Sequence, residues 1–531
     1  MSTLPLPLYE LNDAHPLATR DMSAFRAIAT RFPRSPRHIP ALARQSRFLS
    51  TTKPWNSERD PLLDSEFTRQ TGVDDPFPEK PLHNRPKRRA KPPSEPPGNG
   101  LPVMSLRDMC TCPRCVDPST RQKLFVTAEI PSDIALESVK ELPNGVEIRW
   151  ANDIPGAEPH ISVFDKSIFD AMATTGSAKT LPPMPQRRLW KDYQFRAEAP
   201  DLTYEAYMQD DAVLYQALQQ LHSHGLLFLK DVPESAESVI RITQRIGPLK
   251  NTFYGETWDV RSVPQAKNVA YTSQDLGFHM DLLYMKQPPH LQFLHCIRSS
   301  ASGGASLFTD SFKAINELFS SDEEAFCQLQ KRPITFHYDH IDSHYYQQSR
   351  PLIELAPLHF GATTFPSFDA VRRSEKTLGR SWIRGSFDLK DYLEAVSWAP
   401  PFQAPFQLTN NHVRPSRTGN PKRDPIAIME TNLRHWHSAA KKFNDIIHKT
   451  PNIHERMMGP GECVIFDNRR VLHARKAFEV ADAGKERWLR GAYLDKDPFM
   501  SKLRVLAHRF STANEIALGN NADAEVAAAA S

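Results

Sequence analysis

The stretch Gly277-Phe278-His279-Met280-Asp281 decides how the rest of this 531-residue chain is interpreted. Alternate side chains of a β-strand face the same way, so His279 and Asp281 would project together. Far downstream, the segment 461–468 (GECVIFDN) predicts a turn, a strand and a second turn, and His473 follows almost at once. Two histidines and one carboxylate form the facial triad of non-haem Fe(II) oxygenases, which leaves positions on the iron open.

A His-x-Asp pattern alone is common, and the chain contains 20 histidines, so the neighbourhood of the pattern matters. Arg487 follows His473 by a short hairpin, at the start of the segment 487–493 (RWLRGAY). A bidentate guanidinium is the natural receptor for the far carboxylate of 2-oxoglutarate. We therefore expect catalytic iron ligands at His279, Asp281 and His473, with Arg487 binding the cofactor 2-oxoglutarate.

Composition sets the limits of this interpretation. Apolar residues make up 40% of the chain and charged residues 24%, as in a globular protein, and the length suits two domains with tails. The net charge of +4 comes largely from the first hundred residues. No basic stripe is interleaved with aromatic residues, and no apolar stretch approaches the ~20 residues that span a bilayer, so we expect neither nucleic acid nor a membrane as partner.

The N-terminal hundred residues predict no folded domain. From Met22 to Ser57 there is no Asp or Glu, while six arginines and Lys53 alternate with hydroxyl residues. This composition predicts a mitochondrial transit peptide over residues 1–57, with Met1 or Met22 as the start; a disordered basic tail is the alternative. Residues 58–100 are rich in Pro and charge, which predicts a disordered linker.

The remainder divides into a small domain, a large domain and a tail. We place the small domain at 101–185, the large domain at 190–510 and a flexible tail at 511–531. Many short strands between Gly and Pro breaks favour a β-rich core with flanking helices in the large domain. The clearest expected elements are strands over 123–127, 146–150, 225–229 and 290–296, and a helix over 206–222.

Three of the six cysteines, Cys110, Cys112 and Cys115, lie within six residues of one another. The other three are scattered along the chain. This distribution indicates a metal clip in a reducing compartment, and structural zinc would need one further ligand. Three reduced thiols in a loop and an iron–sulfur centre are the alternatives.

Several motifs together resemble the gamma-butyrobetaine dioxygenase family, within the taurine-dioxygenase-like superfamily. They lie at 106–110 (LRDMC), 268–272 (NVAYT), 279–281 (HMD), 288–296 (PPHLQFLHC), 303–304 (GG) and 491–493 (GAY), and the similarity covers most of residues 101–500. The resemblance implies an α+β fold: a double-stranded β-helix (jelly-roll) core with flanking helices, plus a small zinc-binding N-terminal β-rich domain. It also implies His160 as the fourth zinc ligand and Ser306 as a second contact to 2-oxoglutarate.

The family holds a trimethylammonium group in an aromatic cage. Matching the motifs places this cage on Tyr254, Trp258, Tyr271 and Tyr493, with Asn268 as a polar contact to the substrate. Ring faces attract a permanent cation by ~0.5–2 kcal/mol each. Without the resemblance these aromatics would be interpreted as core residues, and the spacing of Tyr254 and Trp258 is also ordinary helix packing.

The resemblance thus implies hydroxylation of gamma-butyrobetaine to L-carnitine, with O₂ as cosubstrate. Ascorbate is a candidate reductant and a homodimer a candidate assembly. Trimethyllysine dioxygenase, another small-acid hydroxylase and a non-catalytic β-helix binding module are the alternatives. Leu282 and the stretch 372–421 depart from the family pattern, and both lie where they could alter substrate choice.

Overall fold

The structure is a computed structural model, and it describes most of the chain beyond residue 100. The described residues are 101–156, 159–175, 184–261, 273–300, 302–360, 363–379, 381, 387–406, 425–479 and 487–511. The expected transit peptide and linker lie outside these ranges, as does the tail beyond residue 511. Within the described ranges, no helix combines the length and the apolarity that crossing a membrane requires.

Residues 101–175 contain a small antiparallel sheet. Its strands are β1 (Leu136–Leu142), β2 (Gly145–Trp150) and β3 (Ile161–Asp165), with β2 in the centre. Helices α2 (Val103–Asp108) and α3 (Lys166–Thr175) and the 3₁₀ helix η3 (Thr127–Glu129) accompany it. Alternation along the strands buries Ile148, Trp150 and Phe164 on one face, where they pack in a cluster that includes Leu106 and Cys110. The expected strand over 146–150 is confirmed.

The expected strand over 123–127 is wrong. Lys123 makes a single β-bridge with Val116, and the chain then enters η3. The ammonium group of Lys123 donates to Asp108 and to Thr127, and Leu124 and Val126 are exposed. Side-chain hydrogen bonds therefore replace a ladder here, since the apolar residues have no sheet to cover.

Two larger sheets form the core of residues 184–511. The six-stranded sheet has the order β4 (Leu202–Thr203), β5 (Leu226–Lys230), β17 (Glu462–Asp467), β8 (Leu291–Arg298), β19 (Trp488–Leu494), β6 (Thr257–Arg261). The four-stranded sheet has the order β16 (Ile453–Arg456), β9 (Ser306–Asp310), β18 (Val471–Arg475), β7 (Leu276–His279). Strands distant in sequence are neighbours in both sheets, which agrees with the expected jelly-roll core.

Alternation along the strands assigns each side chain to one of two layers. Val464 and Phe466 of β17 pack with Phe308 of β9 in a cluster that both sheets share. Cys463 and Ile465 point the other way, into a cluster with helices α5 (Tyr204–Gln209), α6 (Asp211–His224) and α7 (Ser238–Ile246). Strand β17 is therefore buried on both faces, which explains its continuous apolar sequence.

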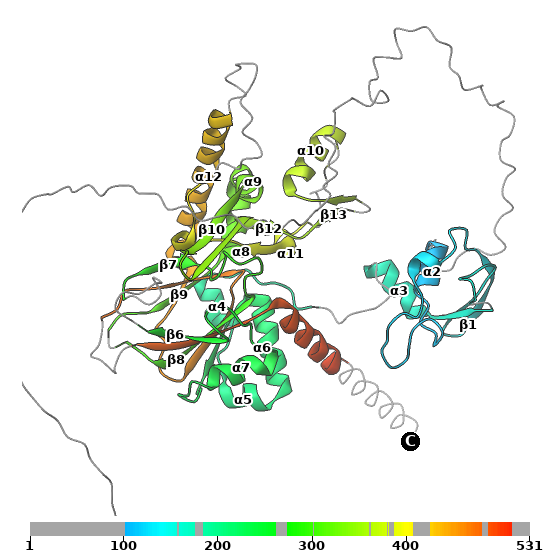
Figure 1. Cartoon of the computed structure of the whole chain (residues 1–531), viewed down its shortest axis with the longest axis horizontal. Coiled ribbons are helices and arrows are strands. Elements are labelled where there is room, and N and C mark those ends of the chain that lie inside the picture. Colours follow the sequence, from blue (N-terminus) through cyan, green and yellow to red (C-terminus); the bar gives the residue numbers. More distant parts are fainter. Residues whose placement is uncertain are drawn as a thin grey trace, which may run out of the picture. The chain divides into compact units, whose positions relative to one another are not determined.

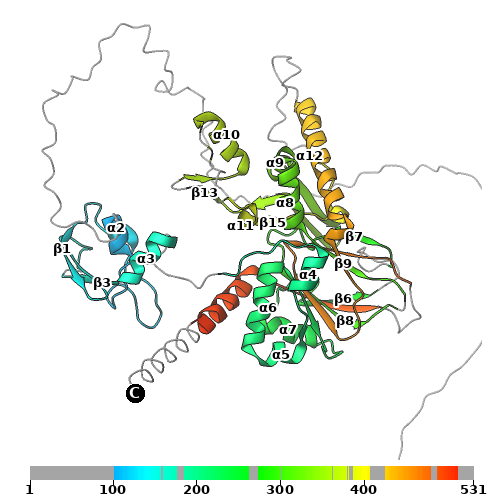
Figure 2. The same ribbon diagram turned by 180° about the vertical axis from the view of Figure 1, so that it is seen from behind.

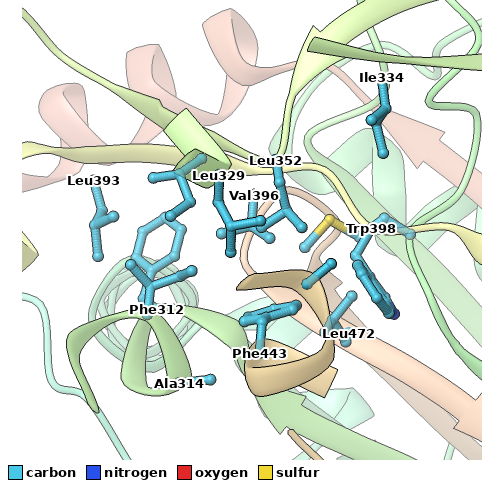
Figure 3. Packing of buried hydrophobic residues seen from close by; sticks show 14 of the residues in the cluster. Phe312, Ala314, Leu329, Ile334, Leu352, Leu393, Val396, Trp398, Phe443 and Leu472 are labelled. Carbon is cyan, nitrogen blue, oxygen red and sulfur yellow. The ribbon is translucent and has the colours of Figure 1, made fainter. Parts of the chain in front are cut away.

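A third apolar cluster joins the helices on the opposite side. Figure 1 and Figure 2 show α8 (Ser311–Ser321), α9 (Glu323–Lys331) and α12 (Pro425–Ile447) together on the side away from α5, α6 and α7. In Figure 3, Phe312 of α8 and Phe443 of α12 lie on either side of Leu329, with Leu472 of β18 nearby. The helices thus complete the α+β fold.

The remaining elements surround this framework. Three two-stranded sheets pair β10 (Pro333–His340) with β11 (His344–Pro351), β12 (Ile353–Leu355) with β15 (Leu393–Val396), and β13 (Leu358–Phe360) with β14 (Thr363–Phe365). The other helices are α4 (Asp192–Glu198), α10 (Phe368–Leu378), α11 (Leu389–Tyr392), η5 (Pro400–Phe402), η7 (Thr450–Asn452) and a last helix over 496–511.

Other local expectations are confirmed with one refinement. The strands expected over 225–229 and 290–296 are β5 and β8. The helix expected over 206–222 is divided into α5 and α6, because the Asp210 carboxylate accepts the backbone N–H of Ala212 and caps α6. The domain boundaries stay predictions.

A buried ion pair fixes the turn between β17 and β18. Arg470 and Asp310 are almost fully buried, and two guanidinium nitrogens donate to the two carboxylate oxygens at 3.1 and 2.9 Å. Arg470 also donates to the backbone carbonyls of Ser223 and Arg188. Because the pair is bidentate and its other donors are satisfied, its burial is compensated.

Gly491 makes room for an indole ring. It is the cross-strand partner of Trp258, and a Cβ built on it would lie 2.4 Å from two atoms of that ring. The indole stacks on Tyr493, with ring centroids 3.9 Å apart and planes inclined by 21°. A side chain at position 491 would therefore displace Trp258.

We expect Gly491→Ala to lower the free energy of unfolding by about 1–3 kcal/mol, because the added methyl group overlaps the indole. Urea denaturation measures this difference. Gly459→Ala is the matched control, since a Cβ there meets only the end of the Glu462 side chain, 3.9 Å away. Equal stability of the two variants would contradict the close approach.

Candidate active site

The register between two strands brings the two histidines together. His279, the last residue of β7, is the direct cross-strand partner of His473 on β18, and their ring centroids are 4.1 Å apart. Asp281 lies in the turn just after β7. Its Oδ1 atom is 3.4 Å from Nε2 of His279 and 3.9 Å from Nε2 of His473. One ligand atom from each residue lies within 4.8 Å of the others, so the three side chains could hold one metal ion.

Both imidazoles turn Nε2 toward this point. Nδ1 of His279 donates its proton to the backbone carbonyl of Gly277 at 2.9 Å, so Nε2 is the nitrogen that a metal could take. Burial, and next the neighbouring His279, lower the pKa of His473 to about 3. The low pKa of His473 suits metal ligation, because a protonated imidazole cannot bind a metal, and the hydrogen bond to Gly277 fixes the orientation of His279.

Asp281 is an ionised carboxylate with two differently used oxygens. Burial alone would raise its pKa, but the imidazoles of His279 and His473 and the hydroxyl of Tyr493 hold the pKa well below its usual range. Oδ2 accepts hydrogen bonds from Nε2 of Gln292 at 2.8 Å and from the Tyr493 hydroxyl at 2.6 Å. Only Oδ1 faces the histidines. Sequence reasoning missed Gln292.

Sequence reasoning also missed Asn468, which holds the backbone of the turn that begins at Asp281. We call this turn, residues 281–284, the metal loop because it carries a candidate ligand. Its Oδ1 accepts the N–H of Asp281 at 2.8 Å, and its Nδ2 donates to the carbonyls of Asp281 and Pro289. The amide is fully buried in the turn after β17. Leu282, which follows Asp281 in the sequence, has φ +60°, a conformation rare for a leucine. The Asn468 clamp therefore stabilises a strained turn beside the candidate ligand.

One cavity contains the candidate ligands and most other predicted site residues. Its wall is formed by Tyr254, Trp258, Val260, Leu276, His279, Asp281, Leu282, Tyr284, Gln292, Leu294, Ser306, Phe308, Phe402, His473, Ala474, Arg475, Arg487, Leu489 and Tyr493. Asn268 and Tyr271, the other predicted substrate contacts, lie outside the described residues. The lining is mainly apolar and aromatic, with a few polar groups that converge, as in enzyme pockets.

Arg487 brings a buried positive charge to this cavity. The residue is only 6% exposed, and burial lowers the pKa of its guanidinium, which nevertheless stays charged. Among the described residues no carboxylate forms an ion pair with it. A buried cation of this kind fits a carboxylate ligand such as one end of 2-oxoglutarate. Ser306, the first residue of β9, lines the same cavity, as does Arg475, which was not predicted.

The three described residues of the expected cage lie on the same cavity but are not free rings around a space. Trp258 and Tyr493 stack on each other, so one face of each ring is already covered. The ring of Tyr254 packs against the ring of Phe253, with centroids 4.1 Å apart, and edge-on against the ring of Tyr338, with centroids 6.3 Å apart. Any cation would therefore meet the remaining face of a stacked pair and the ring of Tyr254.

The second candidate metal centre lies in residues 101–175. The sulfurs of Cys110, Cys112 and Cys115 are 3.5, 3.4 and 3.4 Å from Nε2 of His160. Tetrahedral zinc with ordinary Zn–S and Zn–N bonds would separate these atoms by about 3.5 Å. Burial, and next the neighbouring Cys110, raise the pKa of Cys115 to about 12. Thiolates here need a cation, so the donor set fits structural zinc.

A buried pair of charges orients the histidine of this centre. Oδ2 of Asp153 is 2.8 Å from Nδ1 of His160, which donates its proton and leaves Nε2 facing the cysteines. Oδ1 of Asp153 accepts from Nε of Arg107 at 2.6 Å, and the same guanidinium reaches the sulfur of Cys115 at 3.4 Å. Arg107 and Asp153 therefore form an outer shell around the candidate zinc site.

Two family models match this chain. The model described as taurine catabolism dioxygenase TauD, TfdA family, matches residues 183–493. The model described as gamma-butyrobetaine hydroxylase-like, N-terminal, matches residues 98–157, which include the three clustered cysteines.

Similar curated proteins include enzymes with different names. Dioxygenase str8 of Strobilurus tenacellus is 33% identical, over 76% of this chain and 85% of its own length. The gamma-butyrobetaine dioxygenase of Homo sapiens is 27% identical, over 78% of this chain and 92% of its own. The mitochondrial trimethyllysine dioxygenase of Mus musculus is 24% identical, over 76% of this chain and 81% of its own.

The outer shell of the zinc site generates a prediction. We expect Asp153→Asn to weaken zinc binding by roughly tenfold to a hundredfold, because His160 loses the carboxylate that orients it. Cys112→Ser, which removes a ligand, should release zinc and speed amide hydrogen exchange in β1, β2 and β3, but leave Mn(II) binding at His279, Asp281 and His473. Competition with a chelator, read by native mass spectrometry, measures the zinc affinity.

Glu137→Gln is the control for this experiment, since Glu137 is an exposed carboxylate on β1. If Asp153→Asn retains zinc as well as this control, the carboxylate does not support the site. If carefully purified protein with intact cysteines carries no zinc at all, the site itself is refuted.

Proposed function

The chain belongs to the taurine catabolism dioxygenase TauD, TfdA family, and we propose that it hydroxylates gamma-butyrobetaine to give L-carnitine. It is a dioxygenase whose cofactors are Fe(II) and 2-oxoglutarate, and its Cys₃His cluster is compatible with zinc. When bound, iron and 2-oxoglutarate would couple oxidative loss of CO₂, in which one oxygen atom of O₂ enters succinate, to insertion of the other oxygen atom into a C–H bond. The protein's contribution is to bind, orient and exclude water.

The observation that carries the proposal is the convergence of three chemistries on one cavity. His279, Asp281 and His473 would hold the iron on one facet. Arg487, with Ser306, would bind the far carboxylate of 2-oxoglutarate in the buried part of the cavity. The aromatic wall, with Tyr254 and the pair Trp258–Tyr493, would hold the substrate.

A trimethylammonium group suits this wall because it donates no hydrogen bond and is more weakly hydrated than a primary ammonium group. Cation–π attraction to Tyr254 and to the open face of the Trp258–Tyr493 pair supports the assignment. Asn268 and Tyr271 are proposed from the sequence motifs alone. Trimethyllysine, or another small acid, is the second candidate substrate, since the relative that is 33% identical carries no substrate in its name.

We also propose a mitochondrial location. The acid-free, arginine-rich segment between Met22 and Ser57 supports it. Ascorbate as reductant and a homodimeric assembly remain predictions.

The role of Arg487 is tested by a conservative change. Arg487→Lys should raise the concentration of 2-oxoglutarate needed for half-maximal rate by about tenfold to a hundredfold, because lysine offers a point charge where a planar fork is wanted. The requirement for the amine substrate should change far less. Steady-state assays of succinate release measure both, with Arg490→Lys as control because Arg490 pairs with Asp259 outside the cavity. Equal effects on both substrates would remove Arg487 from this role.

The substrate assignment is tested by a neutral shape mimic. In 5,5-dimethylhexanoate a tert-butyl group replaces trimethylammonium, so the shape is kept and the charge is lost. If cation–π attraction holds the substrate, the mimic should bind about tenfold to a hundredfold more weakly than gamma-butyrobetaine. Competitive binding to the enzyme with Fe(II) and 2-oxoglutarate, without O₂, measures the ratio.

A variant and its control sharpen this test. Trp258→Leu should abolish much of the discrimination, because leucine keeps bulk but has no ring quadrupole. Trp488→Leu should leave it unchanged, since this indole packs on Arg261 outside the cavity. Equal affinity of the wild type for both ligands would overturn the trimethylammonium assignment, while the iron and 2-oxoglutarate site rests on other residues.

A further inference from the structure

We propose that Gln292 and Tyr493 form a cross-strand clamp that holds the Asp281 carboxylate in a one-oxygen orientation toward the metal. The proposal concerns metal binding and does not depend on which substrate the enzyme takes. Neither residue would touch the metal, so both are positioning residues. Tyr493 would thereby serve the iron site as well as the substrate wall.

The geometry of the carboxylate separates its two oxygens. Oδ1 is the atom that approaches Nε2 of His279 and Nε2 of His473. Oδ2 is occupied by two donors, the Gln292 amide at 2.8 Å and the Tyr493 hydroxyl at 2.6 Å. A carboxylate with one oxygen engaged in this way is disfavoured from turning both oxygens to a metal.

The two donors are placed by the sheet. Gln292 of β8 and Tyr493 of β19 are direct cross-strand partners in adjacent strands, so their side chains project from the same face. Both are about 2% exposed. Because antiparallel register fixes their relative position, the donors reach Asp281 as one rigid unit and not as two independent side chains.

The other contacts of each donor indicate that Asp281 is its main hydrogen-bond partner. The other amide atom of Gln292, Oε1, is buried and has no hydrogen-bond partner among the described residues. A buried amide with only one bond is costly, which argues that the bond to Asp281 offsets the cost. Tyr493 is fixed by its stack on Trp258, and Gly491 leaves the room that this stack needs. The Tyr493 hydroxyl is therefore held in one position, within hydrogen-bond distance of Asp281.

The consequence concerns the open positions of the metal. A carboxylate that binds through one oxygen occupies one coordination position, and 2-oxoglutarate with O₂ need three. If the clamp is lost, Asp281 can bind through both oxygens and occupy a position that 2-oxoglutarate would use. Loss of the clamp should thus weaken metal binding and, as a separate effect, weaken the binding of 2-oxoglutarate.

The test uses full-length zinc-loaded protein and Mn(II), which does not compete for a thiolate site. Tyr493→Phe keeps the ring and loses the hydroxyl; Gln292→Met keeps the shape and loses the donor. Each should raise the Mn(II) dissociation constant about tenfold, as is typical when an outer-shell partner of a ligand is lost. Electron paramagnetic resonance of free Mn(II) measures this without turnover, and a second titration measures 2-oxoglutarate binding to the Mn(II) protein.

Tyr207→Phe is the matched control, because it removes an equally buried tyrosine hydroxyl that donates to the Ile242 carbonyl far from the cavity. This control should lose stability but bind Mn(II) and 2-oxoglutarate as the wild type does. The clamp is refuted if Tyr493→Phe and Gln292→Met, both folded by circular dichroism, bind Mn(II) and 2-oxoglutarate within twofold of the wild type. If one of them does not fold, the other decides alone.

Discussion

The pairing of β7 with β18 is the constraint on which the rest of the site depends. It sets His279 directly opposite His473, and a slip of one residue would turn one imidazole to the other face of the sheet. The chain between these two strands holds helices α8 to α12 and four strands of the two large sheets, β8, β9, β16 and β17, so the register is fixed only when these elements have packed. The apolar clusters that surround the strands are therefore what keeps two imidazoles 4.1 Å apart.

Polar contacts as well as apolar packing hold the site together. The turn after β17 carries three polar side chains in succession, and each of them binds a different part of the chain. Asn468 holds the backbone of Asp281, Arg469 pairs with Glu354, and Arg470 pairs with Asp310. These side chains act in different directions, so one short turn connects the metal loop, β12 and the start of α8. Polar residues at this turn thus hold Asp281 in position together with the apolar core.

The sequence was sufficient where chemistry and spacing coincide. The His-x-Asp pattern, the distant histidine and the cysteine trio predicted side chains that the structure brings together. It was insufficient where the partner is set by long-range register. Gln292 is ordinary in an apolar strand, and only its pairing with Tyr493 brings it to Asp281. Similarly, the segment from Lys123 to Thr127 has the composition of a strand, but within the described part of the chain it pairs only through the bridge between Lys123 and Val116. Strand propensity measures how well a segment fits into a sheet, but a strand forms only where a neighbouring strand is available.

Strand β19 has two roles in the cavity wall: it forms part of the aromatic surface, and it provides a hydrogen bond to Asp281. Along β19, Gly491 admits the indole of Trp258, and Tyr493 stacks on that indole while its hydroxyl bonds to Asp281. Aromatic surface that serves the metal loop in this way can offer a ligand one face only. Besides Tyr254 and Phe308, the aromatic wall includes Tyr284 in the loop after Asp281 and Phe402 in η5, whose ring centroids are 5.5 Å apart. The aromatic lining therefore includes rings beyond those that the family motifs identify, and a substrate in this cavity would meet Tyr284 and Phe402 as well.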